Sequence, residues 1–175
     1  EGLFLVHPGK GWPSKTFPVS WWNAIIKGLK DSGKKVAVIG KYVSEEQGYL
    51  DVDCFGCYDV KNMLSVDGLI YLISKANILI SNDSSPVHMA GAFDNWIILI
   101  PTCKHPDHVL PWRKGNQNYK TKSLYKKLAC DDIDSSPTQV HGQTIDWVKN
   151  GDIRPYLPDP KEVVLTVLNC CGGLQ

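Results

Sequence analysis

Short apolar runs that alternate with helical stripes most limit how this chain can fold. The runs are continuous, as in strands buried on both faces of a sheet, and turn or loop signals follow them. They occupy residues 3–6, 36–39, 78–80 and 96–100. Alternation of such strands with helices over short connections predicts an α/β fold, a Rossmann-like three-layer domain with a parallel sheet.

Helical stripes lie between these runs. One apolar face follows the spacing i, i+3, i+4 and i+7, and it consists of Trp22, Ile25, Ile26 and Leu29. Gly33 is placed to end that helix in a left-handed conformation. The sequence therefore opens as strand, helix and strand.

The rest of the chain gives clear and unclear signals. Ser65 is a candidate N-cap for a stripe at positions 66, 69, 70 and 73, Pro86 opens another helix, and a capping-box-like start at 159–162 opens the last one. We also expect a short strand at 52–55. Helix fragments are expected at 123–128 and 143–149, within an otherwise loop-rich stretch at 103–158.

Length and composition suit one soluble domain over residues 1–175. The chain has 175 residues, 43% of them hydrophobic and 21% charged, with a formal net charge of +1. No apolar run approaches the roughly 20 residues that cross a bilayer, so we expect no transmembrane segment. The lysine-rich stretch from Lys114 to Lys127 is more typical of a solvated loop and helix face than of a nucleic-acid site. We expect no nucleic-acid partner.

Cysteine and histidine suggest two weaker hypotheses. Cys54 and Cys57 have the C-x-x-C spacing of redox and zinc motifs, but no second such pair follows. Cys103, His105 and His108 have metal-like spacing in a proline-broken loop. We interpret the six cysteines as thiols in a reducing compartment and expect no metal site and no cofactor.

Two loops carry the chemistry, because each follows a buried strand and would open onto the same crevice. The first, residues 7–18, reads His-Pro-Gly-Lys-Gly-Trp-Pro-Ser-Lys-Thr-Phe-Pro. Its glycines allow close approach of backbone to a ligand, and Lys10 and Lys15 supply positive charge suited to a diphosphate. A proline-braced turn with solvated lysines is the structural alternative.

The second loop, residues 81–88, runs from a strand into the helix opened by Pro86, and a helix amino terminus attracts phosphate oxygens. Asp83 would then shape the turn or bond a sugar or ribose hydroxyl. A serine hydrolase with Ser84 or Ser85 as nucleophile and His88 as base is a competing use of these residues. The missing G-x-S-x-G elbow argues against it. A plain N-cap and a surface histidine remain open as well.

Together, H-P-G-x-G-W-P-S-K-x-F-P and S-N-D-S-x-P-x-H-x-A-x-A resemble motifs of glycosyltransferase family 9, the lipopolysaccharide heptosyltransferase family, in its carboxyl-terminal half. The resemblance is close from Leu3 to Phe93 and weaker to Arg113. It implies the C-terminal half of a GT-B fold, in which two Rossmann-like domains face each other across a cleft. The N-terminal acceptor domain is then absent from this sequence.

The resemblance implies donor-binding residues in the first half of the chain. Lys15 matches the lysine that contacts the diphosphate, and Pro8 and Gly9 belong to the same motif. Glu45 or Glu46, with Glu46 preferred, would match the acid that holds the ribose.

In the second motif, the resemblance implies that Asp83, Ser84 and His88 contact phosphate and sugar. Ser85 stands where the family usually has glycine, so its side chain would narrow the approach to the phosphate or add a donor. We include Ser85 in the expected donor site.

The implied function is nucleotide-diphospho-sugar binding in an inverting, metal-independent glycosyltransferase of bacterial lipopolysaccharide biosynthesis. The acceptor would be a glycan or glycolipid, and the catalytic base would come from the absent domain. We expect a cytoplasmic protein at the inner face of the membrane. The alternative is a stand-alone nucleotide- or phosphate-binding module without transferase activity.

Overall fold

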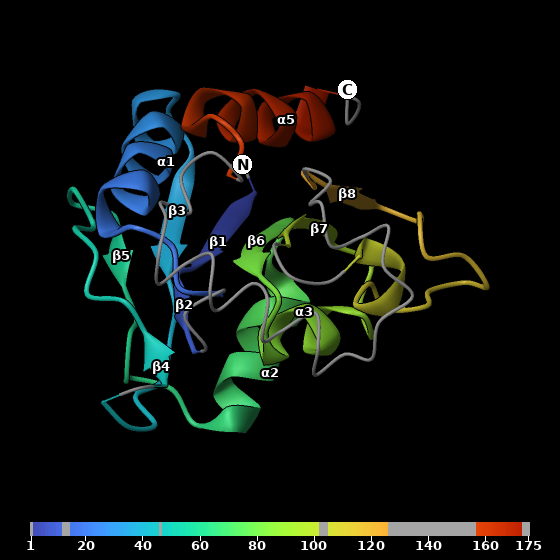
Figure 1. Cartoon of the computed structure of the whole chain (residues 1–175), viewed down its shortest axis with the longest axis horizontal. Helices are drawn as coiled ribbons and strands as arrows, with labels where there is room; N and C mark the ends of the chain where they lie inside the picture. Colours follow the sequence, from blue (N-terminus) through green and yellow to red (C-terminus); the bar gives the residue numbers. More distant parts are fainter. Residues whose placement is uncertain (1, 12–14, 46, 102–104, 126–156, 173–175) are drawn as a thin grey trace, which may run out of the picture.

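In a computed structural model, the structure describes residues 2–11, 15–45, 47–101, 105–125 and 157–172. Helices and strands alternate along most of this length (Figure 1). The elements are β1 (Leu3–His7), β2 (Gly9–Lys10), α1 (Val19–Asp31), β3 (Lys35–Val38), β4 (Gly48–Tyr49), β5 (Tyr58–Asp59), α2 (Val66–Lys75), β6 (Ile78–Asn82), α3 (Ser85–Ala90), β7 (Trp96–Ile100), the 3-10 helix η2 (Pro106–His108), β8 (Thr121–Ser123) and α5 (Pro160–Gly172). None of the helices in these ranges is long and apolar enough to span a membrane.

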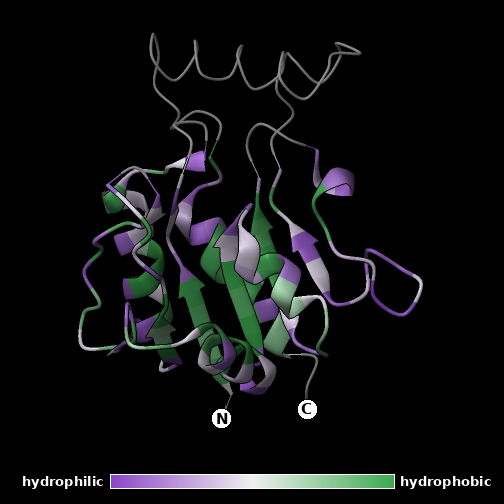
Figure 2. Ribbon diagram, turned by 90° about the horizontal axis from the view of Figure 1, so that it is seen from below, coloured by the Kyte–Doolittle hydropathy of each residue, from purple (hydrophilic) through white to green (hydrophobic). Residues whose placement is uncertain are grey.

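Six strands form one sheet in the order β5-β3-β1-β6-β7-β8, and every neighbouring pair is parallel. Helices α1 and α5 cover one face and helices α2 and α3 cover the other (Figure 1). Figure 2 shows the strands as the hydrophobic centre of the domain. The predicted Rossmann-like α/β fold with a parallel sheet is confirmed.

Helix α1 packs as its stripe predicts. Trp22, Ile25, Ile26 and Leu29 are all fully buried in the core between α1, α5 and the sheet. Gly33 has a φ of 74°, so the predicted left-handed ending is confirmed. Burial of side chains this large contributes about 2 kcal/mol each, which explains why a helix without a side-chain N-cap is stable here.

Helix α2 begins at the predicted cap, because the Ser65 hydroxyl accepts a hydrogen bond from the Gly68 N–H at 3.1 Å. Its stripe is less buried than predicted. Ile73 is buried, but Val66 is 63% exposed. Val66 instead lines a pocket.

The predicted strand at 52–55 is wrong. Phe55 and Gly56 both have positive φ, and the Cys57 N–H donates to the Cys54 carbonyl at 2.7 Å, so this segment is a tight turn. The paired residues lie on either side of it, in β4 and β5. Val52 is apolar because it is buried in the α1 core, not because it belongs to the sheet.

The prediction of a helix fragment at 123–128 is also wrong over residues 123–125, the part of it that the structure describes. Thr121–Ser123 is strand β8, which pairs with β7 at the sheet edge. The free backbone edge of β7 provides hydrogen bonds that outweigh a weak local helical pattern. Residues 126–128 and the fragment at 143–149 lie outside the described residues, as does most of the loop-rich stretch.

Successive strands are added to the sheet first on one side of β1 and then on its other side. Strand β3 pairs with one side of β1, whereas β6 pairs with the other. Helix α1, which follows β1, and helix α3, which follows β6, lie on opposite faces. The carboxyl ends of β1 and β6 therefore form a topological switch point, where ligands bind in open α/β sheets.

Candidate functional site

A pocket of about 380 Å³ opens at this switch point. Its charged lining among the described residues consists of three lysines and one aspartate, namely Lys10, Lys15, Lys41 and Asp83. Backbone of the glycine-rich loop and the hydroxyl-bearing Ser84 and Ser85 complete the polar side. The lining also includes the apolar side chains of Val43, Val66, Leu69 and Met89. The pocket thus combines a cationic lining with an apolar one.

The first loop is shaped by short local contacts. Gly9 and Lys10 form strand β2, which pairs with β4 in antiparallel register. The Gly11 N–H and carbonyl both lie 3.2 Å from the Thr16 hydroxyl, so these residues are joined across the loop. The Lys10 ammonium donates to the Glu45 carbonyl. These contacts bring the lysines of the loop to the pocket.

The two loops meet in an ion pair between the Lys15 ammonium and the Asp83 carboxylate. Both side chains are largely shielded from solvent, at 21% and 12% exposure. An anionic ligand that reaches Lys15 will therefore compete with Asp83 or be held beside it. The placement brings the cation of the first motif to the second motif.

His7, the last residue of β1, is a buried neutral base beneath the second loop. Its Nδ1 lies 3.1 Å from the hydroxyls of both Ser81 and Ser84. Burial lowers the pKa of His7 to about 4, so the imidazole is uncharged at neutral pH. The imidazole within hydrogen-bond distance of Ser84 is therefore that of His7. The hydrolase hypothesis names His88 instead, which is exposed.

Comparison with known proteins decides the family. The sequence profile of glycosyltransferase family 9 (heptosyltransferase) matches residues 2–137, more than half of the chain. The chain belongs to glycosyltransferase family 9. A search of curated protein sequences found no match.

Solved structures share the fold of this family 9 chain. ADP-heptose LPS heptosyltransferase II of E. coli aligns with a TM-score of 0.56 and 18% identity, over 85% of this chain and 47% of that one. A family 9 glycosyltransferase from Veillonella parvula aligns with a TM-score of 0.56 and 15% identity, over 86% and 45%. The dodecameric iron-containing heptosyltransferase TibC, from enterotoxigenic E. coli, aligns with a TM-score of 0.55 and 14% identity, over 86% and 44%. This chain spans about half the length of these proteins.

The structure brings most of the family 9 motif residues to the pocket. Gly9, Lys15, Asp83, Ser84 and Ser85 line it, and Ser85 is exposed at its surface. These five come from loops that follow β1 and β6, as the sequence pattern predicts.

Two expected donor residues are placed differently, and a third lies outside the described residues. Pro8 is buried behind the loop, where its carbonyl accepts from the Leu50 N–H at 2.8 Å. His88 is exposed on α3, and neither residue is among those that line the pocket. Glu46 lies outside the described residues, although the carbonyl of Glu45 contacts Lys10.

Asn82 and His7 are the residues that sequence reasoning missed. Asn82 is 2% exposed, lines the pocket and donates to two carbonyls of the first loop. The sequence did contain a signal for Asn82, because a polar residue that ends a buried strand needs a nearby hydrogen-bond partner. The partners themselves could not be read from the sequence.

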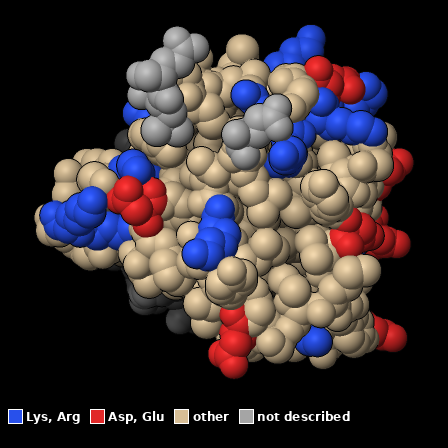
Figure 3. Space-filling model, turned by 180° about the vertical axis from the view of Figure 1, so that it is seen from behind, with Lys and Arg blue, Asp and Glu red and all other residues tan. Residues whose placement is uncertain are grey.

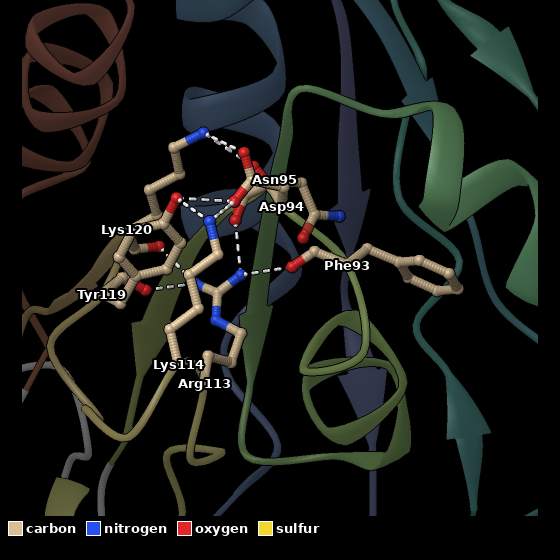
Figure 4. A network of polar contacts seen from close by, with 7 residues as sticks. All are labelled: Phe93, Asp94, Asn95, Arg113, Lys114, Tyr119 and Lys120. Carbon is tan, nitrogen blue, oxygen red and sulfur yellow. Dashed lines mark hydrogen bonds and ion pairs between the residues drawn. The ribbon is translucent and has the colours of Figure 1, made fainter.

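Arg113 is not among the residues that line the family 9 pocket. Its guanidinium is buried and donates to four backbone carbonyls in the turns before β7 and β8 (Figure 4). Asp94 beside it accepts from Lys120, Tyr119 and Lys114, which together hold the pKa of its carboxyl well below the usual range. The neighbouring Trp112 is 72% exposed. Arg113 is a structural brace.

The metal and redox hypotheses gain no support from the described residues. No group of three histidine, cysteine or acidic side chains within them is arranged to hold a metal ion, and Cys103 falls outside them. Cys54 and Cys57 are free thiols, and burial raises the pKa of both. Figure 3 shows basic and acidic side chains interspersed on the face opposite to that of Figure 1.

Proposed function

We propose that this chain is the donor-binding domain of an inverting glycosyltransferase and that its pocket holds a nucleoside-diphosphate sugar. The observation that carries the proposal is the three-lysine, one-aspartate lining of the switch-point pocket. Such a lining attracts a dianionic diphosphate, and Gly9 and Gly11 allow the phosphates to approach backbone. The apolar part of the lining suits the flat face of a nucleobase.

In the proposed reaction, an acceptor hydroxyl attacks the anomeric carbon while the bond from that carbon to the diphosphate oxygen breaks. Negative charge then grows on the leaving diphosphate. Lys15, already directed at this region by its contact with Asp83, would stabilise that charge by a few kcal/mol, roughly the worth of one preorganised donor. The acceptor's proton goes to a base of a second, N-terminal domain.

Lysine charge makes a divalent metal unnecessary in this proposal, because Lys10, Lys15 and Lys41 supply the positive charge at the pocket. Family membership supports a heptosyltransferase-like reaction in bacterial lipopolysaccharide biosynthesis. We therefore propose a glycan or glycolipid acceptor and a cytoplasmic site of action at the inner face of the membrane.

Calorimetric titration of this chain with ADP, UDP and GDP tests donor binding. We expect one nucleotide to bind saturably, and Lys15→Ala to weaken it about tenfold or more through loss of a charge-assisted contact. Lys27→Ala is the matched control, because Lys27 also pairs with an aspartate, Asp31, but on the exposed surface of α1. Equal effects of the two variants, or no binding of any nucleotide, would overturn the proposal.

A further inference from the structure

Asn82 connects the sheet to the glycine-rich loop at two points. Its Nδ2 donates to the Gly9 carbonyl at 3.0 Å and to the Lys15 carbonyl at 2.6 Å. A carboxamide nitrogen has two hydrogens, so both donors are used. A single side chain therefore ties residue 9 and residue 15 to the end of β6.

The anchor of these contacts is rigid. Asn82 is the last residue of β6 and is in register with Ile100 of β7, in the middle of the six-stranded sheet. Its side chain is buried, so water does not compete for the two carbonyls. The two hydrogen bonds therefore hold the loop that carries Lys15 in a fixed position relative to the sheet.

The orientation of the amide is unambiguous. If the carboxamide were turned over, its oxygen would face two carbonyl oxygens and neither could be satisfied. The observed orientation leaves Oδ1 buried without a hydrogen-bond partner in the described part of the chain. An unpaired buried acceptor has a free-energy cost. The orientation that leaves Oδ1 unpaired is the one in which Nδ2 holds the loop.

Gly9 is shaped to this arrangement. A Cβ at position 9 would lie 2.4 Å from Asn82 Oδ1 and 2.9 Å from His7 Cε1. Real Cβ atoms do not approach heavy atoms so closely, so only glycine lets the loop backbone rest against the Asn82 amide. The close contact therefore requires both Gly9 and Asn82.

We propose that Asn82 is a positioning residue that holds the Lys15 backbone so that the Lys15 ammonium reaches the diphosphate. The role rests on the proposed function of the pocket. Asn82 itself acts through Lys15 and does not need to touch the ligand. Removal of its donor should therefore weaken diphosphate binding only while Lys15 is present.

The first test replaces Asn82 with Asp, which has the same shape but cannot donate when ionised and repels the two carbonyls. Asn82→Ala is the second variant, because it removes the donor without adding charge. Asn95→Asp is the matched control. Asn95 is likewise buried, donates to a backbone carbonyl and has an unpartnered Oδ1, but lies at the other end of the sheet.

Two readouts separate positioning from general destabilisation. In calorimetry, each Asn82 variant should weaken binding of the nucleoside diphosphate about tenfold while leaving affinity for the nucleoside nearly unchanged. In a Lys15→Ala background, Asn82→Ala should have almost no further effect. Additive losses in the double variant, or equal losses for nucleoside and diphosphate, would contradict the role.

The second readout does not depend on binding. Amide hydrogen exchange at Gly9, Gly11, Lys15 and Thr16 should accelerate in the Asn82 variants and stay unchanged in Asn95→Asp. Unchanged exchange in all three variants would overturn the inference. If the wild-type chain bound no nucleotide, the proposed function would fail, whereas the exchange result would still decide the role of Asn82.

Discussion

Acidification should destabilise the protein through His7. The pKa of the buried imidazole lies near 4 in the folded chain, below its ordinary value of 6.5. Between these values the unfolded chain binds more protons at this residue, so the stabilising contribution is complete above the upper value and is lost as the pH falls toward the lower one. The difference between 6.5 and about 4 corresponds to about 3 kcal/mol in total. By about pH 5, about 2 kcal/mol of it is lost.

Urea unfolding of the wild type and His7→Asn measures this effect. Asn does not titrate and keeps a polar atom near the two serine hydroxyls, so acidic groups elsewhere contribute equally to both proteins. From about pH 7.5 to about pH 5, the wild type should lose about 2 kcal/mol more of its free energy of unfolding than His7→Asn. His108→Asn, which removes an exposed histidine, should behave as the wild type does. Identical pH dependence in the wild type and His7→Asn would refute the assignment of a buried neutral imidazole.

Two further substitutions test the fold. Arg113→Met should reduce the free energy of unfolding by on the order of 3 kcal/mol, because four backbone carbonyls, one buried and three partly buried, lose a charged donor. Chemical denaturation measures this loss, and a value below about 1 kcal/mol would show that the brace is dispensable. Gly33→Ala should reduce the free energy of unfolding by about 1 kcal/mol from backbone strain alone, since no atom lies within 4 Å of the added Cβ. An unchanged midpoint of thermal unfolding would show that the helix end relaxes.

Expectations that depended on a local pattern were the most successful. The stripe of α1, its glycine ending and the Ser65 cap are all present, because helix periodicity and capping involve residues only a few positions apart. The placement of Lys15 and Asp83 in one pocket followed from a general property of parallel sheets. Each residue was expected beyond the end of a strand, and the strands proved to be neighbours.

Expectations that depended on distant partners failed. Val52 is apolar but belongs to no strand, and Thr121 joins a strand because β7 offers a free edge. His88 looked like the natural partner of Ser84 by sequence distance, yet the imidazole beside Ser84 belongs to His7.

The sequence by itself determined the α/β class, the main helices and buried strands, the two motif loops and their resemblance to family 9. Only the tertiary structure decided the strand order, the Lys15–Asp83 ion pair and the contacts of Asn82 with the first loop. Periodicity and capping are properties of neighbouring residues, so they are readable along the chain. The register of β1 on β6 aligns residues 74 positions apart, such as His7 with Ser81, and arises from packing of the whole sheet.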